Sequence, residues 1–189
     1  GTKLVFAAQN YDASNIYTYE FATGKIEKLT DDLFSDSDPR WSYDGKKVYF
    51  SSDRDTITVR INDYEGYEMY RHDYSQMDIF EYNLETKQVR RLTDYPFSDE
   101  KYALPSQSGD ELLFVSDYNG INNIYKIKPD ANWNPSNPPT PVTNSLNGLD
   151  QISTSYDGKK LALTAMYKAS YNIFTLNNPF GMTTESDSI

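Results

Sequence analysis

The chain has 189 residues, of which 15% are aromatic, and its formal net charge at pH 7 is -10. This acidic balance argues against nucleic acid or an anionic membrane surface as the partner. Cysteine is absent, which excludes disulfides and thiolate chemistry but leaves the cellular compartment open. No apolar run reaches the ~18 residues of a membrane-spanning helix, so we expect no direct insertion into a membrane.

Three landmarks recur along the chain with a period of about 44 residues. The first is a tight turn that ends in glycine, as in Asp44-Gly45 and Asp157-Gly158. The second is the triplet Asn/Asp-Ile-aromatic, and the third is an aliphatic residue followed by threonine. The triplets are Asn15-Ile16-Tyr17, Asp78-Ile79-Phe80, Asn123-Ile124-Tyr125 and Asn172-Ile173-Phe174, and the pairs are Leu29-Thr30, Leu92-Thr93 and Val142-Thr143. A period in this range indicates stacked supersecondary units rather than one globular core.

Each period contains four short runs of β-forming residues, bounded by Gly, Asp, Asn and Pro. In the second repeat the runs are 39–42, 47–51, 78–84 and 88–92, and none has helical spacing. We name the predicted strands a to d from the inside of a ring outward. Residues 1–40 supply b, c and d of one unit, 36–93 and 97–143 supply two complete units, and 149–177 supply a, b and c of a fourth. The sequence therefore predicts an all-β fold of four-stranded antiparallel units, as in the blades of a β-propeller.

Residues 41–55 read Trp-Ser-Tyr-Asp-Gly-Lys-Lys-Val-Tyr-Phe-Ser-Ser-Asp-Arg-Asp, and Asp78-Ile79-Phe80 and Arg91-Leu92-Thr93 follow in the same repeat. This pattern resembles the WD40-like PD40 repeat of TolB-like β-propellers, and the match recurs in all four repeats. Tyr43 and Tyr156 depart from it, because that family usually has proline at their position.

The resemblance implies a ring that commonly has six or more blades, of which residues 1–177 would supply about four. The repeats span approximately 1–40, 41–104, 105–153 and 154–177, and 178–189 form a polar tail or linker. On this interpretation the chain is a segment of a larger protein. The alternative is a closed four-bladed ring with irregular end strands. Trp41 and the triplet isoleucines are expected to pack in the core.

The period breaks between strands b and c of the second repeat, where about 19 residues are inserted within 56–76. Residues 56–61 alternate like a strand and 67–74 are expected to return, which predicts a hairpin on one face of the ring. The fold does not require this segment, and it is rich in Tyr and Arg, which dominate binding hot spots. We predict that it contacts a protein or peptide partner, and the alternative is that it packs on its own blade. The predicted contact residues are Arg60, Tyr64, Tyr67, Tyr70, Arg71, His72 and Tyr74.

The sequence offers little that could support catalysis. The single histidine, His72, cannot by itself build a typical zinc or manganese site, and we expect it to be an exposed loop residue. No nucleophile elbow, zinc-protease motif or P-loop is found. Asp36-Ser37-Asp38 and Asp53-Arg54-Asp55 offer alternate oxygen ligands for calcium, but neither matches an EF-hand loop, and we interpret them as structural. We therefore predict no catalytic residue, metal site or cofactor.

Three functions remain open, and we expect the first. The chain is a non-catalytic interaction or scaffold propeller of a larger bacterial protein, for which the resemblance implies an extracytoplasmic setting in the periplasm or at the cell surface. Its partner is then a protein or peptide on one propeller face, or another domain of the same chain. Alternatively, it is the substrate-gating propeller of a multidomain peptidase or hydrolase whose catalytic residues lie outside 1–189. The third possibility is an enzyme with a metal site in the centre of the ring.

Overall fold

A computed structural model of the chain describes residues 1–10, 13–54 and 68–184. Within these ranges the strands form four antiparallel sheets, in which neighbouring strands are consecutive in the chain. Two short 3₁₀ turns, η1 (Met69–Arg71) and η2 (Pro179–Gly181), interrupt the β structure. No helix in the described ranges is long and apolar enough to cross a membrane.

The four sheets follow the order of the chain, and their strands have these bounds. The first sheet contains β1 (Lys3–Asn10), β2 (Ala13–Glu20) and β3 (Ile26–Lys28). The second contains β4 (Asp36–Trp41), β5 (Lys47–Ser52), β6 (Asp78–Asn83) and β7 (Val89–Arg91). The third contains β8 (Glu100–Pro105), β9 (Leu112–Ser116), β10 (Asn123–Ile127) and β11 (Thr140–Pro141). The fourth contains β12 (Leu149–Thr154), β13 (Lys160–Tyr167) and β14 (Ser170–Asn177).

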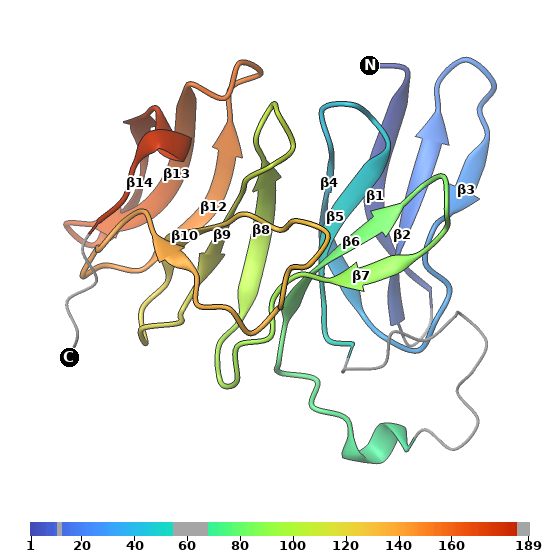
Figure 1. Ribbon diagram of the computed structural model, residues 1–189, viewed down its shortest axis with the longest axis horizontal. Coiled ribbons are helices and arrows are strands. Elements are labelled where there is room, and N and C mark those ends of the chain that lie inside the picture. Colours follow the sequence, from blue (N-terminus) through green and yellow to red (C-terminus); the bar gives the residue numbers. More distant parts are fainter. Residues whose placement is uncertain (11–12, 55–67, 185–189) are drawn as a thin grey trace.

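The sheets lie side by side in chain order, from β1–β3 at one end to β12–β14 at the other (Figure 1). β8, the first strand of the third sheet, contacts β4 of the second sheet and β12 of the fourth, so the sheets converge along these strands. The prediction of an all-β fold built of propeller blades is confirmed. The first sheet has the order b, c, d and the fourth has the order a, b, c.

Hydrophobic clusters of buried residues fill the spaces between consecutive sheets. Successive side chains of a strand point to opposite faces of its sheet. Val48 and Phe50 of β5 therefore pack toward the first sheet, while Tyr49 packs toward the third. Trp41 is half-buried and packs, as expected, against the cluster between the first and second sheets. Each inner sheet thus buries both of its faces, one against each neighbour.

The triplet isoleucines show what a neighbouring sheet contributes. Ile16, Ile79 and Ile124 are 1%, 0% and 0% exposed, because each faces the following sheet. Ile173 holds the same position in the fourth sheet but is 77% exposed, so the expectation that it packs in the core is wrong. Leu4 of β1, on the opposite outer face, is 48% exposed. In a closed four-bladed ring these two faces would cover each other, and the structure does not support that alternative.

The aliphatic-Thr pairs close the outer edge of the first three sheets. Their aliphatic members are buried. Each threonine hydroxyl accepts a hydrogen bond from the N–H of the triplet isoleucine in the adjacent strand. The three bonds run from Ile16 to Thr30, from Ile79 to Thr93 and from Ile124 to Thr143, at 2.9, 2.8 and 2.9 Å. Two landmarks of the repeat are therefore the two sides of one strand pairing.

Replacement of Ile124 by alanine should lower the free energy of unfolding by about 2–5 kcal/mol, because the side chain is buried between the third and fourth sheets. Ile173→Ala, at the same position of the repeat, should change it by less than ~0.5 kcal/mol, because that side chain is exposed. Urea unfolding of the purified chain measures both values. Equal losses in the two variants would contradict the uncovered face of the fourth sheet.

Candidate functional site

The connections between strands lie at two opposite ends of the sheets (Figure 1). The described part of the β5–β6 connection and the β7–β8 connection lie at one end, which we call the insertion face. The a–b and c–d turns, such as Asp44-Gly45, lie at the other end, which we call the turn face. All predicted contact residues that the structure describes belong to the insertion face.

Arg54, two residues after β5, forms a buried ion-pair cluster at the base of the insertion. Its Nη2 atom lies 2.6 Å from Oδ1 of Asp36 and 3.0 Å from Oδ2 of Asp32. The guanidinium also lies over the rings of Phe50 and Phe80, 5.2 and 5.3 Å from their centroids. Burial raises the pKa of Asp32 to about 6. The cluster ties the loop before β4 to the end of β5.

His72 is buried, so the expectation that it is an exposed loop residue is wrong. Its side chain is 2% exposed, and Nε2 lies 3.4 Å from Oδ2 of Asp53. The imidazole ring also packs against Phe34 and Tyr74, with centroid separations of 5.2 and 4.7 Å. Asp53 in turn accepts a hydrogen bond from the Ser35 N–H at 2.7 Å. A carboxylate and an aromatic ring from distant parts of the chain thus form a pocket that receives the imidazole and anchors the end of the insertion.

Tyr70, Arg71 and Tyr74 project from the insertion face as an exposed group, which we call the knob. The carboxylate of Glu68 accepts the Tyr70 hydroxyl at 2.9 Å and pairs with Nε of Arg71 at 3.1 Å. The Tyr74 hydroxyl donates to the carbonyl of Met69 at 2.9 Å. The knob is therefore exposed to solvent but held by local hydrogen bonds.

The structure brings together part of the predicted contact set. Tyr70, Arg71 and Tyr74 are exposed beside one another, and His72 lies beneath them as an anchor. The other three predicted residues, Arg60, Tyr64 and Tyr67, lie outside the described residues. Within 68–76 the chain forms η1, where we expected the returning strand of a hairpin, because local hydrogen bonds to Glu68 and Met69 replace a strand ladder.

Phe97 is an exposed residue of the insertion face that sequence reasoning missed. It lies between β7 and β8, is 99% exposed and has a positive φ of 69°. Its N–H donates to Oε1 of Gln76 at 3.2 Å, and Nε2 of Gln76 donates to the carbonyl of Ser98 at 2.6 Å. Gln76 therefore joins the end of the insertion to the loop that carries Phe97. A left-handed backbone at phenylalanine is strained, and no pattern in the sequence signals it.

Glu100 occupies the position in β8 that Asp36 occupies in β4 but, among the described residues, no cation pairs with it. The residue equivalent to Arg54 in the third sheet is Tyr118. Oε1 of Glu100 instead accepts hydrogen bonds from two serine hydroxyls, each at 2.8 Å. Burial raises the pKa of Glu100 to about 9, so the carboxyl group is protonated at neutral pH. One position of the repeat is thus an ion pair in the second sheet and a neutral acid in the third.

Two described residues of the Asp-rich stretches, Asp36 and Asp53, hold loops together. Asp36 pairs with Arg54, and Asp53 faces His72. Burial raises the pKa of Asp38. In the part of the chain that the structure describes, no group of three His, Cys, Asp or Glu side chains is placed to hold a metal ion.

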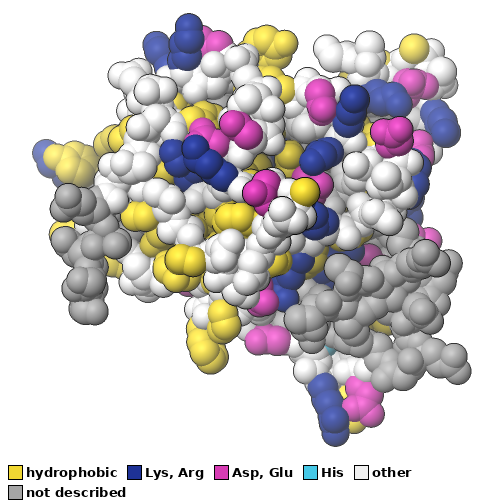
Figure 2. Space-filling model, viewed as in Figure 1, with side chains coloured by type: hydrophobic (Ala, Val, Ile, Leu, Met, Phe, Trp, Pro, Cys, Tyr) yellow, Lys and Arg dark blue, Asp and Glu magenta, His cyan; other side chains and the backbone are white. Residues whose placement is uncertain are grey.

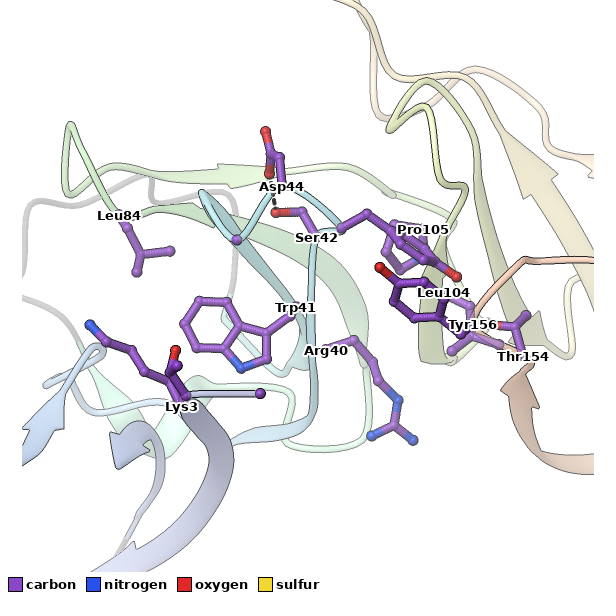
Figure 3. A pocket seen from close by; sticks show the side chains of 14 residues that line it. Lys3, Arg40, Trp41, Ser42, Asp44, Leu84, Leu104, Pro105, Thr154 and Tyr156 are labelled. Atoms are coloured by element: carbon purple, nitrogen blue, oxygen red, sulfur yellow. Dashed lines mark hydrogen bonds between the residues drawn. The ribbon is translucent and has the colours of Figure 1, made fainter. Parts of the chain in front are cut away.

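The turn face contains a cavity of about 840 Å³ where the first, second, third and fourth sheets approach one another. In Figure 3, Trp41 lies between Lys3 of β1 and Arg40, and Tyr156 projects from the fourth sheet. Nε1 of Trp41 is buried and has no hydrogen-bond partner among the described residues. Tyr43 and Tyr156, which stand where the PD40 pattern usually has proline, pack against each other with their ring centroids 5.9 Å apart.

The inner strands of the second, third and fourth sheets share a bulge that the sequence pattern does not predict. The third residue of each, Asp38, Tyr102 or Gln151, has a positive φ, of 52°, 59° and 41°. The pairing with the next strand shifts at each of these points. The three residues line a cavity of about 460 Å³, where burial raises the pKa of Tyr102 to about 12. The repeat therefore places strained, polar residues where the inner strands converge.

Comparison with known proteins identifies relatives of this fold. No protein-family model matches the chain. It is 26% identical over 125 residues to the Tol-Pal system protein TolB of Francisella tularensis, in both the mediasiatica and tularensis subspecies. The match covers 66% of this chain and 24% of the relatives, so the chain spans about a quarter of their length.

Solved structures superpose on nearly the whole chain. Putative TolB from Agrobacterium tumefaciens superposes with a TM-score of 0.71 at 18% identity, over 97% of this chain and 60% of that one. TolB from Acinetobacter baumannii gives 0.65 at 23% identity, over 96% of this chain and 39% of that one. The chain has the TolB-like β-propeller fold.

TolB-like sheets of this kind also occur in enzymes. A chain from a structural analysis of two prolyl endopeptidases superposes with a TM-score of 0.56 at 13% identity, over 97% of this chain and 25% of that one. The TolB-like fold alone therefore does not distinguish a binding role from a role beside a catalytic domain.

Stability of this TolB-like segment should depend on pH through Glu100. The folded pKa of about 9 lies above the ordinary carboxyl value of 4.5, so the folded chain binds this proton more tightly than the unfolded chain. The stabilising contribution is fully present below about pH 4.5 and is lost as the pH rises toward 9. Glu100→Gln keeps a neutral group, so its advantage over the wild type should grow across that range in urea unfolding. A constant difference between the two proteins would contradict this assignment.

The corresponding replacement of a carboxyl group by an amide in the second sheet should have the opposite effect. Asp36→Asn removes a buried partner of Arg54 and should destabilise the fold by about 3–5 kcal/mol at neutral pH, as expected for a broken buried ion pair. Urea unfolding at pH 7 compares it with Glu100→Gln. Stabilisation by Asp36→Asn would show that the ion pair does not hold the base of the insertion.

Proposed function

We propose that the propeller segment formed by this chain is a non-catalytic binding region of an extracytoplasmic protein. Its insertion face would hold a protein or peptide partner. The observation that carries this proposal is the group of exposed side chains formed by the knob and Phe97. Aromatic residues and arginine in this setting are the residue types that supply most of the binding energy in protein interfaces.

The insertion face is suited to binding because its exposed side chains are already held in place. The buried His72 fixes the chain beneath Tyr74, and Glu68 holds the ends of Tyr70 and Arg71. Side chains that are ordered before binding lose less conformational entropy on association. We also propose Arg60, Tyr64 and Tyr67 as contact residues; they precede the knob in the chain and lie outside the described residues.

The relatives support a protein partner and an extracytoplasmic setting. Those that match in sequence are Tol-Pal system proteins, and the resemblance to TolB-like propellers implies the periplasm or cell surface. The partner is a separate protein, a peptide, or another domain of the same polypeptide.

The likeness to prolyl endopeptidases favours a second role, in which the propeller controls access to a hydrolase domain outside residues 1–189. The two roles differ in what the full-length protein does to a bound peptide. In the gating role the peptide is hydrolysed, whereas in the binding role it is recovered intact.

Site-specific photo-crosslinking tests the binding surface in the full-length protein. Benzoylphenylalanine at position 74 should give a discrete protein adduct in the native host. Benzoylphenylalanine at position 21 should not, although Tyr74 and Phe21 are both 59% exposed, because Phe21 lies on the turn face. Arg71→Glu should lower the adduct yield, because the change of a hot-spot residue costs at least ~2 kcal/mol of binding free energy.

Two results would contradict this placement of the partner. One is the same adduct from positions 74 and 21, which would indicate random collision. The other is an adduct from benzoylphenylalanine at position 156 but not at position 74, which would move the binding site to the cavity of the turn face.

A further inference from the structure

A cleft of about 450 Å³ opens on the insertion face, where the β7–β8 and β9–β10 connections approach each other. Residues 94–98 of the first connection, Asp117, Tyr118 and Gly120 of the second, and Ser136 of the β10–β11 connection line it. Hydrophobic and acidic side chains both appear at the lower edge of Figure 2, where the β7–β8 connection lies. The volume is within the range of ligand pockets, which is roughly 300–1,000 Å³.

The β10–β11 connection forms one wall of the cleft by reaching across to the second sheet. It spans residues 128–139 and is longer than the equivalent connections of the first and second sheets. The Asp94 N–H donates to the Pro135 carbonyl at 3.1 Å. The Tyr95 hydroxyl donates to the Asn137 carbonyl at 2.8 Å. The extra length therefore holds the β7–β8 connection in place beside the cleft.

Exposed aromatic rings form the apolar part of the cleft. Phe97 and Tyr118 both line it and both are exposed. The Tyr118 ring is held by edge contacts with the rings of Tyr95 and Tyr125, at centroid separations of 5.1 and 5.8 Å. Phe97 is held by its strained backbone at a place where its side chain contributes little to the core. Such rings offer their faces to a cation.

Two carboxylates supply the charge of the cleft. Oδ1 of Asp94 pairs with Nη2 of Arg91 at 3.0 Å. Oδ1 of Asp117 accepts the Asp99 N–H at 2.8 Å. Asp99 pairs with Lys101, but within the described ranges no cation lies at ion-pair distance from Asp117. The net charge of -10 adds to the attraction of a cationic group to this carboxylate.

The second sheet contains an occupied version of the same site. Asp53 holds the position of Asp117 in the repeat, and each carboxylate accepts the N–H of the residue before the inner strand, at 2.7 and 2.8 Å. In the second sheet the imidazole of His72 lies against Asp53 and packs on aromatic rings. The third sheet has no insertion, because residues 117–122 alone join β9 to β10. It therefore presents to a partner the aspartate and aromatic rings that the second sheet uses to hold its own side chain.

We propose that this cleft binds an arginine side chain of a protein or peptide partner. The guanidinium pairs with the Asp117 carboxylate and lies over the ring of Tyr118, beside Phe97. Arginine suits both contacts, because its planar guanidinium forms paired hydrogen bonds with a carboxylate and stacks on aromatic faces, whereas the ammonium of lysine is a more strongly hydrated point charge. This inference rests on the function proposed above and names the residue that the partner must present.

The peptide acetyl-Gly-Arg-Gly-amide tests the cleft by NMR titration of the intact chain. It should shift the signals of residues 94–98 and 117–120, and added salt should weaken its binding. The same peptide with citrulline in place of arginine keeps the shape of the side chain but has no charge. It should bind at least about fivefold more weakly, because it loses the charged hydrogen bonds to Asp117.

Two variants of the chain assign the contacts. Asp117→Asn should weaken binding of the arginine peptide at least about fivefold, because the amide still accepts the Asp99 N–H but carries no charge. Asp110→Asn makes the same change of charge at an exposed aspartate of the turn face and should leave binding unchanged. Phe97→Gly should also weaken binding, yet its urea midpoint should stay the same or rise, because glycine adopts a positive φ without strain.

Several outcomes would overturn the arginine site. They are equal binding of the arginine and citrulline peptides, no shifts at the cleft, or equal affinities of Asp117→Asn and Asp110→Asn. Photo-crosslinking at position 74 separates this inference from the proposed function. A partner adduct without arginine binding would keep the insertion face as the partner surface and reject the arginine site. Arginine binding without an adduct would support the site and reject the partner at the knob.

Discussion

The packing of one sheet against the next is the interaction on which the rest of this structure depends. A blade has two apolar faces and can bury them only against its neighbours, so stability is approximately a sum of nearest-neighbour interfaces. β5 illustrates this, since Phe50 packs on the first sheet and Tyr49 packs toward the third. The fold therefore strongly restricts which residues can occupy alternate positions of the strands, and it only weakly restricts the sequence and length of the connections.

Polar landmarks of the repeat work within this packing and differ from one sheet to the next. The threonine hydroxyl that accepts the isoleucine N–H is the same in the first three sheets, because every closed outer edge needs that pairing. The acid at the start of the inner strand is less uniform. Asp36 has Arg54 beside it, whereas Glu100 has Tyr118 at the corresponding position and remains protonated. A repeat can therefore keep its geometry while it changes the charge of a buried site.

The insertion illustrates how a propeller can acquire a specific surface without a new core. Its base is attached through buried polar contacts, above all His72 with Asp53, while Tyr70 and Tyr74 remain exposed. Phe97 comes from the neighbouring connection and is joined to the insertion through Gln76. Loops carried by a rigid scaffold commonly provide binding function for this reason.

The sequence by itself determined the period and the number and order of strands in each sheet, because these follow from local alternation and turn residues. It also marked the insertion as the place where the repeat stops. Only the tertiary structure decided that His72 is buried, that Phe97 and Ile173 are exposed, and that Asp38, Tyr102 and Gln151 form equivalent bulges. Each of these depends on groups far apart in the chain, or on whether a neighbouring sheet is present, and spacing along the sequence carries no information about such contacts.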